Sequence, residues 1–171
     1  MLVGRELCID DTQIESSLVG FRPAFGRQEE FEVPTSPNGL RGVNKKIKLF
    51  LSKNPAGFTA SLRAVLDMNP KAMMIALNDR IPDGRDVSWI WDVDFEMIGP
   101  KTSVVVTGDR VYDLALRIQY AEKKNMTVES DIKKAIEKGL LQLKHGETLY
   151  ILATYSAMLD IRKILTGRKI L

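Results

Sequence analysis

The chain has 171 residues, of which 44% are hydrophobic and 27% are charged, the balance of one globular domain. Its 25 Lys and Arg residues exceed its 22 Asp and Glu residues by too little to indicate nucleic-acid binding. One cysteine excludes an intrachain disulfide and a cysteine-rich metal site, and one histidine excludes a multi-histidine metal site. We therefore expect no metal site in this domain and no nucleic-acid partner.

The chain shows no targeting or membrane signal. No apolar run approaches the roughly 20 residues of a transmembrane helix. The first ten residues also lack the basic start and apolar stretch of a secretory signal. We expect a cytoplasmic chain with no transmembrane segment.

The first forty residues have little hydrophobic periodicity and several Pro and Gly residues. We expect residues 1–20 to form a linker or a disordered segment and residues 21–171 to form the domain. An irregular strand is predicted around Arg27 to Val33.

From there the pattern predicts alternating strands and helices. Apolar and polar residues alternate over residues 46–51, as in a strand, and three short apolar runs are typical of strands buried on both faces: 72–77, 103–107 and 148–153. Asn54 is a suitable N-cap for a helix from Pro55 to about Met68. Further helices are predicted over about 109–123, about 128–143 and 156–165.

This order of elements predicts an α/β fold, an open Rossmann-like three-layer sheet with helices on both faces. Ligands of such sheets bind at the carboxyl ends of the strands, where this chain places polar or small residues. Lys53 and Asn54 follow one strand and begin a helix, a natural anion site or simply a capped turn. Thr154 and Ser156 follow another strand, where a hydroxyl residue binds a ligand or caps the next helix. The chain has no glycine-rich phosphate loop, so we expect no nucleotide binding by this domain alone.

Residues 79–100, the acidic loop, hold five aspartates and both tryptophans. Because crowded carboxylates are costly unless they are solvated or paired, the loop has either full solvent access or a function. Three functions remain open: magnesium binding, general-base work and orientation of an imidazole. An imidazole would come from another polypeptide. Trp89 and Trp91 alternate with Val93 and Phe95, as in an edge strand packed on the core or in a partner surface.

Five segments match a known family: PAFGRQEEFEV (23–33), LSKNPAGF (51–58), ALNDRIPDGRDVSWIWDVDFE (76–96), VTGDRVYDLALRIQYA (106–121) and LYILATYSAMLDIRK (149–163). They resemble the C-terminal domain of the MurT subunit of lipid II isoglutaminyl synthase, over about residues 21–169. The order of elements is also similar to the third domain of Mur ligases. The resemblance implies the Mur ligase C-terminal-domain fold and a part in the ATP-dependent amidation of D-glutamate in lipid II.

The resemblance also implies a partner, a glutaminase of the GatD kind, which docks on this domain and receives an aspartate that completes its Cys-His site. Transferred to this chain, the aspartate lies between Asp86 and Asp94. We favour Asp86, then Asp92, with Asp94 also a candidate, and we expect the tryptophans to face the partner. By analogy with Mur ligases, Lys53, Asn54 and Asp79 would face the substrate cleft.

The chain departs from the family's whole subunit because the N-terminal and central ligase domains are absent from it. ATP and magnesium are therefore expected for the complete enzyme, and no cofactor is expected in this domain, which should be inactive alone. Two alternatives stay open: a stand-alone small-molecule-binding or regulatory module with this fold, and an independent enzyme that uses the acidic loop with magnesium.

Overall fold

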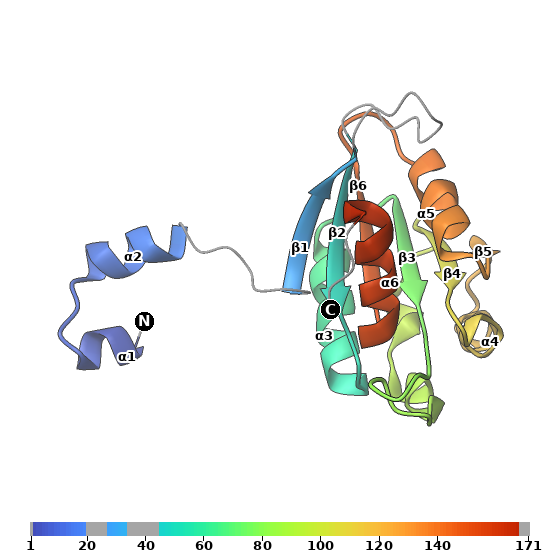
Figure 1. The fold of residues 1–171 in the computed structure, drawn as a ribbon, viewed down its shortest axis with the longest axis horizontal. Helices are drawn as coiled ribbons and strands as arrows, with labels where there is room; N and C mark the ends of the chain where they lie inside the picture. Colours follow the sequence, from blue (N-terminus) through green and yellow to red (C-terminus); the bar gives the residue numbers. More distant parts are fainter. Residues whose placement is uncertain (1, 20–26, 34–44, 168–171) are drawn as a thin grey trace.

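The computed structural model describes residues 2–19, 27–33 and 45–167. It contains a six-stranded sheet in the order β1-β2-β6-β3-β4-β5, in which β1 is antiparallel to β2 and the other strands are parallel (Figure 1). The strands are β1 (Arg27–Glu32), β2 (Lys46–Leu51), β3 (Ala72–Ala76), β4 (Ser103–Thr107), β5 (Met126–Val128) and β6 (Thr148–Ala153). The predicted α/β three-layer fold is confirmed.

Helices cover both faces of the sheet. One face packs against α3 (Pro55–Asp67), α4 (Val111–Tyr120) and two short 3-10 helices, η1 (Ser88–Asp92) and η2 (Phe95–Met97). The other face packs against α5 (Ile132–Leu141) and α6 (Tyr155–Thr166). Because β3 and β4 lie inside the sheet and under both layers, every residue of these two strands is buried. This is the physical reason why their sequences are continuous apolar runs.

The strand β5 was not predicted. The sequence pattern predicts a helix from about residue 128, whereas the structure pairs Met126–Val128 with β4 and begins α5 at Ile132. Asp131 is the N-cap of α5, and its side chain accepts a hydrogen bond of 2.9 Å from the backbone N–H of Lys134. A three-residue, partly exposed edge strand leaves no periodicity for sequence analysis to detect.

The N-terminal segment forms two short helices, α1 (Leu2–Glu6) and α2 (Asp11–Val19), where we expected a linker or disorder. α2 buries none of its residues, and Figure 1 draws both helices apart from the sheet. None of the described residues 2–19 belongs to the core. The domain boundary at residue 20 stays a prediction, because residues 20–26 lie outside the described part of the chain. Within that part, no helix has the length and hydropathy needed to span a membrane.

Candidate functional site

Three strand ends meet around Asn78, which follows β3 and is fully buried. Its backbone N–H donates to Thr154 Oγ1 at 3.0 Å, and its side-chain amide donates to Ser156 Oγ at 3.1 Å. Its Oδ1 accepts a hydrogen bond of 2.9 Å from the backbone N–H of Asp109. Thr154 is the N-cap residue of α6, as the sequence allowed, but its hydroxyl accepts from Asn78 and makes no capping hydrogen bond. One asparagine thus joins the ends of β3, β4 and β6.

The acidic loop is attached to the start of α6 by Asp83. Its carboxylate accepts a hydrogen bond of 2.8 Å from the backbone N–H of Ser156 and a second one from the Ser156 hydroxyl. It also accepts from the backbone N–H of Arg80 at 3.2 Å. A carboxylate at a helix N-terminus is stabilised by the unpaired N–H groups there. Sequence analysis did not assign this role, because 73 residues separate Asp83 from Ser156.

Two arginines hold further carboxylates at this end of the sheet. Arg80 bridges Asp109 and Asp160, each at 2.8 Å, and these contacts raise the pKa of its guanidinium. Arg110 binds Asp113 at 2.8 Å and Asp79 at 3.1 Å. The carboxylate of Asp79, expected to face a substrate cleft, is therefore engaged within the domain.

The three aspartates proposed for the partner's site are all exposed, but they differ in what holds them. Asp86 accepts a hydrogen bond of 2.8 Å from the backbone N–H of Ser88, which lowers its pKa below 3.8. Asp94 pairs with Arg63 at 3.3 Å. Within the described residues, the carboxylate of Asp92 has no hydrogen-bond or ion-pair partner. Asp86 and Asp92 thus lie at the two ends of the η1 segment, open to another molecule.

Arg117, which sequence analysis missed, anchors the chain just after Asp92. Its side chain is buried and binds Glu96 through two hydrogen bonds of 2.9 and 3.0 Å, which lower the pKa of Glu96 below 4.5. It also donates to the Val93 carbonyl at 2.6 Å. Its guanidinium lies 5.6 Å from the ring centroid of Trp91. The planar fork of an arginine suits this combination of bidentate pairing and stacking, and it fixes the loop on α4.

The two tryptophans have different surroundings. Trp89 packs against the core next to Phe58, whereas Trp91 is 48% exposed and contacts the ring of Tyr120 edge-on at 5.3 Å. Neither residue belongs to a strand, so the edge-strand interpretation is wrong. Of the two, Trp91 is the more exposed side chain.

An exposed apolar patch continues from Trp91 onto α4. Tyr112, Leu116 and Tyr120, spaced four residues apart on this helix, are 76%, 49% and 68% exposed. A contiguous set of large apolar side chains at the surface is typical of an interaction site. The spacing of these three residues was visible in the sequence, but only the structure shows that this is the outer face of the helix.

Lys53 and Asn54 are exposed at the end of β2. The Asn54 side chain accepts a hydrogen bond of 2.8 Å from the backbone N–H of Gly57, so it caps α3 as predicted. In the sheet, β6 lies between β2 and β3, which keeps these residues one strand away from Asp79. Their role in substrate binding stays a prediction.

The acidic loop offers little to a metal ion. Across residues 2–19, 27–33 and 45–167, no three His, Cys, Asp or Glu side chains are arranged to hold one. The carboxylates of Asp79 and Asp83 are bound to an arginine and to backbone N–H groups instead. The magnesium alternative stays a prediction, because one or two carboxylates can hold this ion together with substrate phosphates.

Comparison with known proteins places this arrangement in a family. Residues 51–158 match the family model described as MurT ligase C-terminal. The MurT subunit of lipid II isoglutaminyl synthase (glutamine-hydrolyzing) from Streptococcus pneumoniae is 33% identical over 98% of this chain and 36% of its own length. The same subunit from Staphylococcus aureus (strain COL) is 41% identical over 63% of this chain and 26% of its own length. The chain thus spans about a third or less of these relatives.

Solved structures agree with the fold. A folylpolyglutamate synthase from Mycobacterium tuberculosis, solved with ADP and AMPPCP, aligns with a TM-score of 0.56 and 18% identity over 95% of this chain and 36% of that one. The UDP-N-acetylmuramate-alanine ligase MurC from Thermotoga maritima aligns with a TM-score of 0.52 and 16% identity over 98% of this chain and 36% of that one. At these identities the likeness concerns the fold alone. From the family match and the similarity to the two MurT subunits, we conclude that the chain belongs to the MurT ligase C-terminal family.

Proposed function

We propose that this chain is the domain of a lipid II isoglutaminyl synthase that docks a GatD-type glutaminase and lends an aspartate to its Cys-His site. The observation that carries the proposal is the η1 segment, where exposed Asp86 and Asp92 flank exposed Trp91. The relatives are subunits of a glutamine-hydrolyzing enzyme, whereas this chain contains one cysteine and one histidine, far apart in sequence. A chain with carboxylates at its surface and no imidazole beside them can lend a carboxylate to a histidine of its partner. We call this the borrowed-carboxylate proposal.

The contacts of Asp86 suit the role of orienting an imidazole. Its Oδ1 accepts from the backbone N–H of Ser88, which orients a carboxylate that is otherwise exposed at the surface. The same contact favours the ionised form, since it lowers the pKa of Asp86. An ionised, oriented carboxylate holds a histidine in the required tautomer and stabilises its protonated state. Asp92 ranks second, and Asp94 third because Arg63 already pairs with it.

The docking surface in this proposal is the exposed apolar patch formed by Trp91, Tyr112, Leu116 and Tyr120. It lies directly beside the candidate aspartates, because Arg117 holds the end of η1 against α4. Tryptophan and tyrosine are enriched among residues that dominate interface energetics. Lipid II would be the substrate of the complete enzyme, which would use ATP on domains outside this chain, and we assign no ATP step to these residues.

The test is glutamine hydrolysis by the glutaminase in complex with this chain. Asp86→Asn should reduce the turnover about 10³- to 10⁴-fold, as expected for loss of an imidazole-orienting carboxylate, while binding remains unchanged. Asp67→Asn is a matched control, because Asp67 is an exposed aspartate at the end of α3, shortly before the start of β3 and outside the η1 segment.

Three outcomes separate the alternatives. Loss of hydrolysis in Asp92→Asn rather than Asp86→Asn moves the role to the second candidate. Full hydrolysis by the variant with Asp86, Asp92 and Asp94 all changed to asparagine ends the borrowed-carboxylate proposal. Absence of any association with the glutaminase in calorimetry favours a stand-alone binding module with this fold.

Docking is tested separately with Trp91→Ala, compared with Ile164→Ala as an exposed apolar control on α6. Truncation of a central interface tryptophan should weaken the complex at least about 30-fold, whereas the control should stay within about twofold. Equal affinities of the two variants would contradict docking at this patch.

A further inference from the structure

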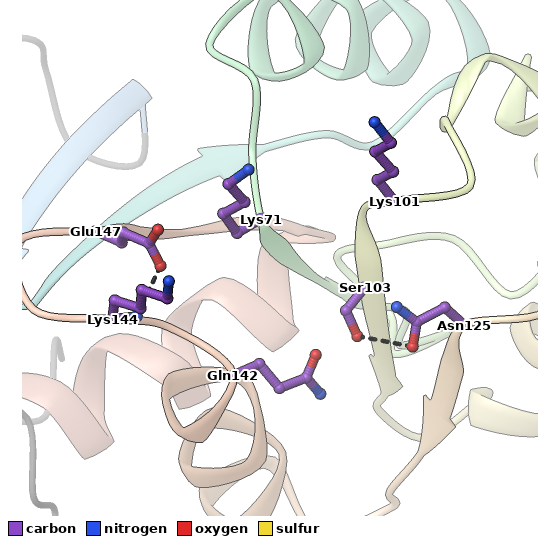
Figure 2. Close-up of a pocket in the computed structure, with 7 residues that line it drawn as sticks. All are labelled: Lys71, Lys101, Ser103, Asn125, Gln142, Lys144 and Glu147. Atoms are coloured by element: carbon purple, nitrogen blue, oxygen red, sulfur yellow. Dashed lines mark hydrogen bonds between the residues drawn. The ribbon is translucent and has the colours of Figure 1, made fainter.

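The amino end of the sheet carries a pocket that the proposed function does not use. It has a volume of about 390 Å³, which is within the usual range for small ligands. Its lining comes from the residues that precede β3, β4 and β5 and from the loop between α5 and β6 (Figure 2). None of the candidate aspartates Asp86, Asp92 and Asp94 lines it, so the pocket is a separate feature.

Positive charge dominates the pocket. Lys71, Lys101 and Lys144 line it, and Glu147 is the single acidic residue of the lining. Among the residues that the structure describes, none of these three ammonium groups forms an ion pair. Glu147 accepts a hydrogen bond from the backbone N–H of Lys144 at 2.7 Å, not from its ammonium.

Capping of backbone carbonyls does not account for these lysines. Lysines near helix ends commonly donate to unpaired carbonyls, and two neighbours do so here. Lys45 donates to the Leu140 carbonyl at 2.8 Å, and Lys123 donates to the Gly99 carbonyl at 2.5 Å. Within the described residues, the ammonium groups of the three pocket lysines donate to no such carbonyl, so their charges remain available.

The neutral lining adds hydrogen-bond donors. The Ser103 hydroxyl donates to Asn125 Oδ1 at 3.3 Å, which leaves the Asn125 amide N–H groups as donors (Figure 2). Gln142 contributes a second amide. Ammonium and amide groups together suit the oxygens of phosphate, whose several acceptors and negative charge match both.

We propose that this pocket binds the phosphate groups of a ligand that carries two or more negative charges. Three unpaired cations around one opening require that much charge for neutralisation, and a monoanion would leave an excess. A soluble diphosphate and the clustered headgroups of anionic phospholipids present the same chemistry. The proposal does not depend on the glutaminase or on any residue of the acidic loop.

The experiment is calorimetric titration of the full chain with inorganic pyrophosphate at low ionic strength. Saturable binding should weaken about tenfold in Lys71→Gln/Lys101→Gln, since each exposed charge pair contributes modestly. The matched control is Lys133→Gln/Lys163→Gln, which removes the same charge from exposed positions on α5 and α6 and should stay within about twofold. Added salt should weaken binding in the wild-type chain.

A second arm distinguishes the two sources of phosphate. Co-sedimentation is measured with vesicles of phosphatidylcholine alone and with phosphatidylglycerol added. Binding to the anionic vesicles that is lost in the pocket variant, without saturable pyrophosphate binding, assigns the site to a lipid surface. Pyrophosphate binding without vesicle binding assigns it to a soluble ligand. Equal weakening in the pocket and control variants, or no binding in either arm, overturns the proposal.

Discussion

Acidic side chains gather at the carboxyl end of the sheet and lysines at its amino end, and the two groups differ in the contacts that they make. At the carboxyl end and along the acidic loop, arginines and backbone N–H groups engage most carboxylates: Arg80, Arg110 and Arg117 each bind at least one acid. At the amino end, lysines bind backbone carbonyls or, in the pocket, have no partner among the described residues. Arginine forks can fix a loop because they bind two oxygens at once, whereas lysine is a mobile point charge. The arginine contacts thus hold the acidic loop in a fixed position, whereas the ammonium groups at the amino end can move.

The largest expected effect concerns Arg117, the buried anchor of the acidic loop. Arg117→Met should lower the free energy of unfolding by about 2–3 kcal/mol, because it removes a buried guanidinium that binds a carboxylate and a carbonyl and packs on two rings. Urea unfolding followed by tryptophan fluorescence measures it. The control Arg63→Met removes an exposed pair with Asp94 and should cost less than about 1 kcal/mol. Equal losses in the two variants would show that burial does not distinguish these arginines.

A smaller effect is expected at the contact between the acidic loop and α6. Asp83→Asn should lower the free energy of unfolding by about 1–2 kcal/mol, since it weakens the carboxylate contacts at the helix N-terminus. Thermal unfolding, with Asp67→Asn as control, measures the difference. A loss in Asp67→Asn as large as that in Asp83→Asn would contradict a specific role for this contact.

The pH dependence tests the pairing of Glu96 with Arg117. The pKa of Glu96 is lowered from 4.5 in the folded chain, chiefly by its hydrogen bonds with Arg117. The stabilisation is therefore present above the unfolded value of 4.5 and is lost as the pH falls through the lower folded value. Because Glu96 is more than half exposed, the contribution should be under about 1 kcal/mol.

Unfolding at pH 7 and pH 3 checks this expectation in the wild-type chain and in Glu96→Gln. At pH 7 the wild-type chain should have a higher free energy of unfolding than Glu96→Gln. This difference between the two proteins should become smaller at pH 3. A difference that stays constant between the two pH values would show that the charge of Glu96 contributes nothing.

The smallest effect is expected at the amino end. Lys71→Gln/Lys101→Gln should change the free energy of unfolding by less than about 0.5 kcal/mol, because these ammonium groups form no ion pair with described residues. Urea unfolding under the conditions used for Arg117→Met gives a direct comparison. Destabilisation above about 1 kcal/mol would mean that the pocket lysines support the fold, and the contrast between the two ends would fail.

Sequence patterns predicted the layered sheet and the Asn54 cap because both depend on local order. Buried strands such as β3 and β4 need apolar residues at every position, and the N-cap needs an acceptor beside a helix start. The strand β5 was missed because three partly exposed residues show no period. Asp83, Asn78 and Arg117 were missed because their partners lie 73, 76 and 21–24 residues away, and no spacing rule connects such distant residues.

By itself, the sequence determined the order of the buried strands and the helices that cover them, the acidic character of the loop after β3 and the resemblance to the MurT family, since these follow from hydrophobic period and residue identity. The tertiary structure decided which charged side chains are paired within the domain and which are exposed without an ion-pair partner among the described residues. It pairs Asp79 and Asp94 with arginines, leaves Asp86 and Asp92 at the surface, turns Trp91 outward and Trp89 inward, and gathers three lysines from separate segments around one pocket. The reason is that neutralisation and burial depend on distances between side chains, and only the folded chain sets those distances.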